Sequence, residues 1–164
     1  MSKIILQPKE PGMNPSSEEL ASVVLERIGL LPRKTGSTDK MHNTLLELYE
    51  RTKRANREKK PEEAVMTVEE MGYFAGITRQ TMYDYLRRWL DLNLITKTSY
   101  IDQNNKVVIG YKLNGNTLEQ AFEKARARIN NNLELTLKYI RELQKTVKNE
   151  KISQSQKSRD KEKS

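Results

Sequence analysis

The chain has 164 residues, 35% hydrophobic and 32% charged, with a formal net charge of +8. This length and polarity fit one domain with exposed extensions, and the positive charge favours a polyanionic partner such as nucleic acid. There is no cysteine and only one histidine, which excludes disulfides, thiol catalysis and metal sites of cysteine or clustered histidine. No apolar run reaches the ~20 residues that cross a bilayer, and the first residues lack a signal peptide's apolar core. We therefore expect a cytoplasmic protein with no membrane partner.

Positive charge is concentrated in the C-terminal third. Residues 1–36 carry five basic against four acidic side chains, residues 37–115 thirteen against eleven, and residues 116–164 twelve against seven. A site within the middle segment would therefore depend on the placement of a few cations and not on bulk charge.

Proline and glycine mark residues 1–15 as a flexible or extended arm. Residues 16–36 are expected to form a helix and a loop, because Ser16 and Glu19 have the spacing of a reciprocal capping box. The expected inner face of this helix is Leu20, Val23, Val24 and Ile28. This helix should cover one edge of the core, and the alternative is an arm that binds a partner.

A second helix is predicted from Asp39 to about Asn56, capped by Ser37 or Thr38. Its apolar stripe is Met41, Leu45, Leu48 and Tyr49. The preceding segment 33–38 lacks the residue order of a phosphate-binding loop. The cationic run 51–60 is interpreted as the solvated end of this helix, with contact to a phosphate backbone as the alternative.

Two short helices joined by a tight turn follow. Thr67 and Glu70 form a capping box for the first, and Gly76 ends it because glycine tolerates a positive φ. Thr78 caps the second helix, residues 78–92, whose buried side chains should be Met82, Leu86 and Trp89 or Leu90. Gly72 is small enough for the two helices to cross closely.

From Ile95 the apolar period changes to two, which predicts a β-hairpin over residues 95–113 with a turn at Asp102 to Asn105. Asn104 and Asn105 suit the positive-φ positions of the turn. A long helix over residues 116–149, capped by Asn116 or Thr117, is predicted next. Residues 150–164 are expected to be a disordered basic tail.

The segment MTVEEMGYFAGITRQTMYDYLRRWLDLNLI resembles the helix-turn-helix of winged-helix transcriptional regulators. The features that match are Glu69-Glu70-Met71, Gly72, Gly76-Ile77-Thr78, Thr81-Met82-Tyr83, Leu86 and Leu92-Asn93-Leu94-Ile95. The resemblance covers roughly residues 39–115, and Asn93 stands where that family usually has glycine. It implies a mainly α fold with a small β-hairpin wing (α+β), a winged helix-turn-helix domain over residues 37–115, and a function in binding double-stranded DNA.

In such a protein the helix 78–92 would read the major groove and the hairpin would touch the backbone or the minor groove. The expected DNA-contacting residues are Thr78, Arg79, Gln80, Thr81, Tyr83, Asp84, Arg87, Arg88, Lys97 and Lys106. Arginine can pair with guanine and glutamine with adenine, while Thr78, Thr81 and Arg88 are better placed for phosphate. Asp84 departs from the family pattern, because an aspartate can accept from cytosine but repels phosphate.

Apolar residues recur every three or four positions along the long helix. They are Leu118, Phe122, Ala125, Ile129, Leu133, Leu137, Ile140, Leu143 and Val147, with a four-residue slip between Ile129 and Leu137. About 30 residues of helix span roughly 45 Å, more than the winged domain can cover. All but Leu118 are assigned to a homodimer interface, as in winged-helix proteins with a C-terminal dimerisation helix. The alternative is packing against the chain's own N-terminal helix.

The leading functional hypothesis is thus a homodimeric, sequence-specific regulator of transcription that is associated with the nucleoid. The alternatives are a low-specificity nucleoid, replication or segregation protein, and a winged-helix module that binds protein. No nucleophile, base and orienting group occur together at an informative spacing. We expect neither an enzyme nor a bound cofactor or metal.

Overall fold

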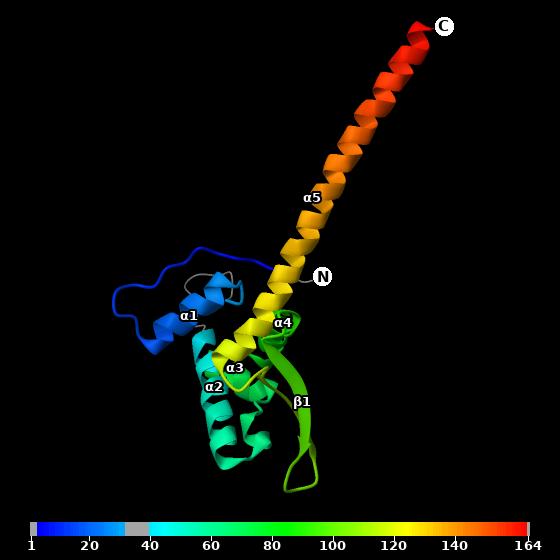
Figure 1. Ribbon diagram of the computed structural model, residues 1–164. Helices are drawn as coiled ribbons and strands as arrows, with labels where there is room; N and C mark the ends of the chain where they lie inside the picture. The colour runs from blue at the N-terminus through cyan, green and yellow to red at the C-terminus, as the bar shows by residue number, and fades with distance from the viewer. Residues whose placement is uncertain (1–2, 32–39, 164) are drawn as a thin grey trace. The chain divides into compact units, whose positions relative to one another are not determined.

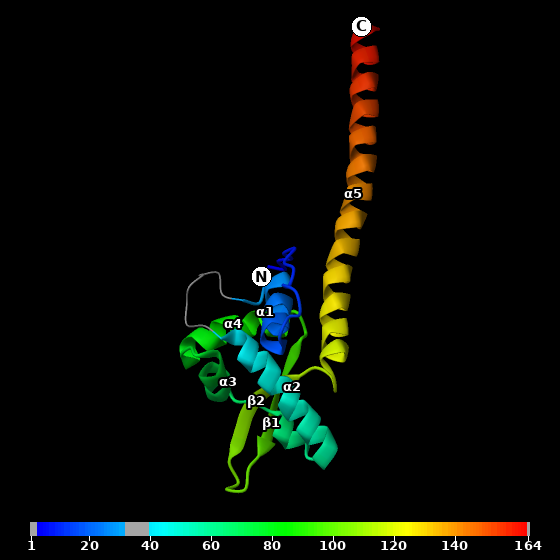
Figure 2. The same ribbon diagram turned by 90° about the vertical axis from the view of Figure 1, so that its left-hand side faces the viewer.

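The computed structural model describes residues 3–31 and 40–163. It is mainly helical, at 65%, with a two-stranded antiparallel hairpin and a long C-terminal helix, which confirms the predicted α+β class (Figures 1 and 2). The chain divides into two units, Met1–Arg126 and Ala127–Ser164. The first unit therefore includes the N-terminal arm and the first turns of the long helix, both of which we had placed outside the central domain.

The N-terminal arm packs against the end of helix α1 (Ser17–Arg27). The backbone N–H of Gln7 donates to the Arg27 carbonyl at 3.0 Å, and the Arg27 side chain donates to the Lys9 carbonyl. Gly29 has a φ of 73°, and a Cβ there would lie 2.8 Å from the Cβ of Ile5. These contacts hold the arm in an extended path, which is one of the two conformations expected from its prolines and glycine.

Helix α1 begins as predicted, since the Ser16 hydroxyl accepts from the N–H of Glu19 at 3.1 Å. The predicted capping box is not reciprocal, because the Glu19 carboxylate accepts from the N–H of Gly12 at 3.0 Å. Its buried face differs from the prediction. Val23 is buried, but Leu20 and Val24 are each 44% exposed. Ala21 and Leu25, one position further along the same i,i+4 spacing, are buried in their place. The helix is rotated so that this smaller pair faces α2.

Helix α2 (Met41–Glu58) carries the predicted apolar stripe. Met41, Leu45 and Leu48 are all at most 3% exposed. Thr44 is also buried and donates to the Met71 carbonyl at 2.9 Å, so its hydroxyl is satisfied. The helix begins at Met41 and not at Asp39, and its N-cap residue Lys40 provides no side-chain cap. The predicted caps, and the segment 33–38, lie outside the described residues.

A short 3-10 helix, η1 (Pro61–Ala64), leads to α3 (Val68–Ala75), α4 (Arg79–Asp91), β1 (Ile95–Ile101) and β2 (Val107–Leu113). The strands pair from Ile95↔Leu113 to Ile101↔Val107. Met66 and Tyr111 exchange two backbone hydrogen bonds of 2.8 Å, which places the chain before α3 beside β2. A Cβ on Gly110 would lie 2.5 Å from Val65, so this approach requires glycine.

Helix α5 (Leu118–Glu162) has 45 residues and is capped by the Thr117 hydroxyl, which accepts from the N–H of Gln120 at 3.1 Å. In the first unit, Ala121 and Ala125 are fully buried. The helix continues thirteen residues past the predicted end at residue 149, so the expectation of a disordered tail is wrong for residues 150–162. No glycine or proline follows Gly115, and the Lys, Glu and Gln of this region favour helix.

Candidate nucleic-acid interface

A glycine helix end, a threonine cap and a close helix crossing at a second glycine determine where α4 lies in the first unit. Gly76 ends α3 with a φ of 71°, and the Thr78 hydroxyl accepts from the N–H of Thr81 at 3.2 Å. A Cβ on Gly72 would lie 3.0 Å from the Ile77 carbonyl and 3.7 Å from the Met82 Cβ, so glycine permits a close crossing of α3 and α4. These observations confirm the predicted turn and caps.

The two faces of α4 differ sharply in burial. Met82, Leu86 and Trp89 are at most 1% exposed and anchor the helix in the core. The opposite face exposes Arg79, Gln80, Tyr83, Asp84 and Arg87. These five side chains share one face because they recur at spacings of three and four. The prediction that they face outward is confirmed.

Arg79 already has partners in the free protein. Its Nε lies 3.2 Å from a carboxylate oxygen of Glu69, and its Nη2 donates to the Tyr83 hydroxyl at 3.3 Å. The guanidinium carbon is 5.5 Å from the centre of the Tyr83 ring. The hydrogen bond with Tyr83 and the charge of Glu69 raise the pKa of Arg79. The cation is thus held on the exposed face, but Glu69 competes for it.

The Glu69 contact was not predicted from the sequence. Glu69 lies in the first turn of α3 and has the ordinary signature of a helix-start acid. Only the crossing of α3 and α4 brings it to Arg79. By contrast, Arg87 makes no ion pair or hydrogen bond within the described part of the chain, so its guanidinium is available to a ligand.

Arg88 does not belong to the exposed face. It is half-buried, and its Nη1 donates to the Gly29 carbonyl at 3.4 Å. This bond connects α4 to the end of α1, and the predicted phosphate contact of Arg88 stays a prediction. At the start of α4, the hydroxyls of Thr78 and Thr81 lie 2.9 Å apart and remain near the positive end of the helix dipole.

The hairpin turn forms a protruding end of the first unit in both views (Figures 1 and 2). A carboxylate oxygen of Asp102 accepts from the N–H groups of Asn104 and Lys106 at 2.8 and 2.9 Å. Asn105 alone takes a positive φ, of 59°, whereas we predicted this for Asn104 as well. Lys97 and Lys106 are exposed, as a role in contacting phosphate requires.

One side of the hairpin is unexpectedly apolar. Ile101, Val107 and Ile109 are 70%, 67% and 56% exposed, and Ile101 pairs directly with Val107. Lys97 and Ser99 lie on the same side, because they are two and four residues from Ile101 and Ser99 pairs with Ile109. This period of two is visible in the sequence, and it could have identified the side. Exposed apolar side chains beside two lysines suit a surface that meets the grooves of a duplex as well as its phosphates.

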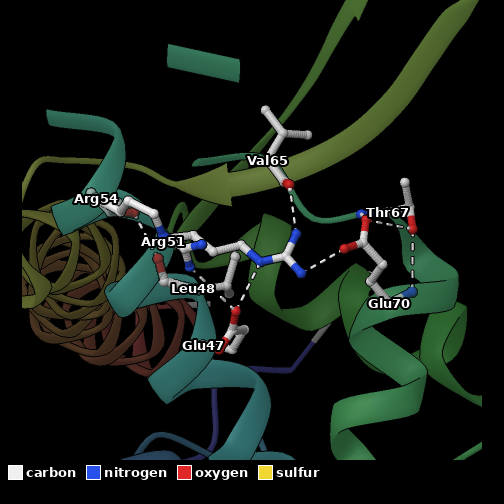
Figure 3. A network of polar contacts seen from close by, with 8 residues as sticks. Glu47, Leu48, Arg51, Arg54, Val65, Thr67 and Glu70 are labelled. Atoms are coloured by element: carbon white, nitrogen blue, oxygen red, sulfur yellow. Dashed lines mark hydrogen bonds and ion pairs between the residues drawn. The ribbon is translucent and has the colours of Figure 1, made fainter. Parts of the chain in front are cut away.

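The cationic run 51–60, most of which lies in the last turns of α2, contributes less than its charge suggests. Arg51 is 19% exposed and lies between three acceptors (Figure 3). It contacts Glu47 at 3.0 Å and Glu70 at 2.6 Å, and it donates to the Val65 carbonyl at 3.1 Å. This arginine holds α2 to the start of α3 and is not free to bind phosphate.

Glu70 links this network to the capping box. Its other carboxylate oxygen accepts from the N–H of Thr67 at 3.2 Å. Burial acts to raise the pKa of Glu70, but the hydrogen bonds from Arg51 and Thr67 outweigh it and the pKa is lowered. Glu70 is therefore held ionised where α3 begins, directly before the candidate reading helix.

The predicted dimer stripe of α5 divides into covered and uncovered parts. Ala125 is fully buried within its own unit, so its assignment to a dimer interface is wrong, and Ile129 is 9% exposed. The other predicted residues are exposed in the single chain: Phe122 37%, Leu133 57%, Leu137 38%, Ile140 47%, Leu143 61% and Val147 42%.

The part of the chain that the structure describes has no group of three or more His, Asp or Glu side chains that could hold a metal ion. None of its helices is long and apolar enough to cross a membrane. Comparison with protein-family models, with curated proteins and with solved structures finds no match to this chain.

Proposed function

We propose that the chain is a homodimeric, sequence-specific binder of double-stranded DNA, most simply a regulator of transcription. The observation that carries the proposal is the exposed face of α4, which presents Arg79, Gln80, Tyr83, Asp84 and Arg87 from a helix anchored by buried Met82, Leu86 and Trp89. A rigidly mounted helix with polar side chains on its free face suits the width of the major groove.

The side chains on this face match the hydrogen-bonding edges of the bases. Arg79 and Arg87 can each donate two hydrogen bonds to guanine, and Gln80 can pair with adenine. Asp84 can accept from the amino group of cytosine, and it disfavours positions where it would meet phosphate. A face with both signs of charge therefore favours sequence selection over indiscriminate attraction.

Contacts to the phosphate backbone of the duplex would set the position of α4 in the major groove. The hydroxyls of Thr78 and Thr81 lie at the N-terminus of α4, where a phosphate is favoured by the helix dipole. Lys97 and Lys106 extend the cationic surface along the hairpin, which would act as the wing against the backbone or the minor groove.

A homodimer accounts for the exposed apolar side chains of α5. A single helix in water does not keep a stripe such as Leu133, Ile140 and Leu143 exposed without a cost in solubility, and a second copy is the simplest cover. Two copies would also present two α4 helices to one duplex, which multiplies the effect of a mildly basic reading surface.

A protein with little sequence preference is the second candidate, and the end of α5 favours it. Residues 148–163 carry six basic against three acidic side chains, and all of them are exposed. Such a helix can attract any duplex through counterion release. A module that binds protein is a third possibility, which rests on the exposed carboxylates Asp84 and Glu69.

Titration of the full chain with duplexes at several salt concentrations separates these functions. A sequence-specific binder retains a difference between preferred and random duplexes as salt increases, because base contacts release few counterions. Equal affinities that decline together would identify the low-specificity binder. Absence of binding even at low salt would reject both DNA functions.

A further inference from the structure

An apolar groove of about 520 Å³ lies where α1, α2 and the first turns of α5 meet. Its lining includes Leu20 and Val24 of α1, Tyr49 of α2, and Leu118 and Phe122 of α5. Leu20 and Val24 are each 44% exposed, and Phe122 is 37% exposed. Apolar side chains gathered in an open groove mark a surface that another apolar element covers.

The chain itself contains an apolar element of matching kind. Beyond residue 130, every described residue of α5 is exposed, including the stripe Leu133, Leu137, Ile140, Leu143 and Val147. Along the sequence this stripe continues the one that starts with Leu118 and Phe122, at the same spacings of three and four. The α5 residues of the groove and the residues of the stripe thus form one apolar line in the sequence of a single helix.

This line is nearly symmetric about Leu133. The residues at equal distances on either side, to within one position, are Leu118 with Val147, Phe122 with Leu143, and Ile129 with Leu137. Antiparallel helices meet at residues that are equidistant from the crossing centre. A second α5 in the opposite direction would therefore place Leu143 and Val147 of one copy opposite Phe122 and Leu118 of the other; Ala125, which is buried in its own unit, takes no part in this contact.

We propose that α5 of a second copy packs antiparallel to this helix, centred on Leu133, so that Leu143 and Val147 of the second copy fill the groove. The proposal deepens the dimerisation part of the proposed function and rests on it. It gives one occupant to two surfaces that are both uncovered in the single chain, the groove and the distal stripe.

The charged residues that flank the apolar line of α5 favour an antiparallel second helix. Glu119 lines the groove and is exposed. In the antiparallel register it lies beside Lys145 and Lys148 of the second copy, and Glu123 lies beside Arg141. A parallel, in-register pair would instead place Phe122 against its own duplicate, and it would leave Leu143 and Val147 far from either groove.

Distances between spin labels test the direction in the full chain. The sequence has no cysteine, so a single introduced cysteine is the only labelling site. In Lys148→Cys the labels lie fifteen residues from the centre in each copy, which gives a separation of roughly 45 Å at 1.5 Å per residue. A parallel dimer would bring them to about 10 Å, the usual distance between packed helices.

Glu134→Cys is the matched control, because it lies next to the centre and gives a short distance in either direction. A long distance at position 148 with a short one at position 134 is the expected result. Short distances at both positions would overturn the antiparallel arrangement, and so would an absence of any coupling in a monomeric chain. These readouts need no DNA, so failure of DNA binding leaves them unchanged.

Occupation of the groove is tested by Val24→Arg, a change on α1 and not on α5. We expect it to raise the dimer Kd, measured by sedimentation, by about tenfold or more. Val107→Arg, which makes the same change at an exposed valine of the hairpin, should leave the Kd unaltered. An unchanged Kd in Val24→Arg would exclude the groove as the docking site. Circular dichroism of the variant monomer checks that α1 remains folded, and the spin-label distances do not depend on this variant.

Discussion

Arg79 gives the sharpest test of how α4 would read DNA, because the structure already supplies a competitor. To reach a base edge, its guanidinium must leave Glu69, whose carboxylate lies 3.2 Å away. Glu69→Gln removes the competing charge and nearly preserves the shape. The two side chains are 61% and 57% exposed, so water screens their attraction. We therefore expect the substitution to strengthen duplex binding by only about two- to fivefold.

Arg79→Ala should act in the opposite direction and by more. Loss of a bidentate contact to guanine weakens binding to the preferred duplex by roughly five- to 150-fold, and it relaxes selectivity at one base pair in each half-site. In the double variant the gain from Glu69→Gln should disappear, because the carboxylate then has no arginine to release. Such non-additivity is the signature of a direct interaction.

Fluorescence anisotropy with the preferred duplex and its single-base-pair variants measures both effects. Glu62→Gln is a suitable control, because it changes the net charge equally at an exposed position of η1. The competition would be refuted if Glu69→Gln and Glu62→Gln gave equal gains. The base contact would be refuted if Arg79→Ala weakened all duplexes by the same factor.

Three further predictions concern the support and the selectivity of α4. Arg51→Met should lower the free energy of unfolding by about 2–3 kcal/mol in urea titrations at neutral pH, because it leaves two carboxylates and a carbonyl without their partner. Arg54→Met, which removes only a 3.9 Å contact to the same α2 glutamate, should cost under ~0.5 kcal/mol. The pKa of Glu70 is lowered in the folded state, so ionised Glu70 stabilises the fold above the ordinary glutamate pKa, and this stability is lost as the pH falls through the lowered value. Arg51→Met should therefore lose less stability than the unchanged chain when the pH is lowered. Gly72→Ala should lower stability in thermal unfolding by about 1–3 kcal/mol, because its Cβ would press on a carbonyl 3.0 Å away. Asp84→Asn should raise affinity for random duplexes and remove the preference at one base pair, as measured by competition binding.

Each of these has a result that contradicts it. Equal costs for Arg51→Met and Arg54→Met would mean that the network in Figure 3 adds no stability. An unchanged melting temperature for Gly72→Ala would show that the α3–α4 crossing can widen freely. If Asp84→Asn altered no duplex affinity, the carboxylate would face a protein partner or solvent and not a base.

The helix pair was predictable from sequence because short-range residues determine its ends. Thr67 with Glu70, Gly76 and Thr78 each act within one helical turn, and Asn93 takes the expected positive φ, of 59°. The predicted bounds of α4 therefore agree with the structure to within one residue at each end. The exposed and buried faces follow, because the 3.6-residue period places Met82 and Leu86 opposite the polar side chains.

Contacts between elements distant in sequence were not predictable in this way. The sequence of α1 contains two apolar pairs one position apart, Leu20 with Val24 and Ala21 with Leu25. Only the packing of α1 on α2 decides that the second pair is buried while the first stays exposed. Arginine commonly contacts phosphate, but the sequence does not show that the fold brings the Gly29 carbonyl close enough to accept a hydrogen bond from Arg88.

The prediction for the end of α5 was wrong for a different reason. Its residues are polar enough to suggest disorder, yet they contain no helix breaker, and composition alone does not distinguish a solvated helix from an unfolded tail. Ala125 was assigned to a partner because of its place in the apolar line. Its small side chain is instead what allows the first turns of α5 to pack closely in their own unit.

Selection of bound duplexes from a random pool with the full chain tests the central claim most directly. A dimer that reads DNA through α4 should enrich a motif with two related half-sites, and Arg79→Ala should erase the preference at one position in each. Retention of duplexes without any enriched motif, or retention of none, would contradict sequence-specific reading by α4.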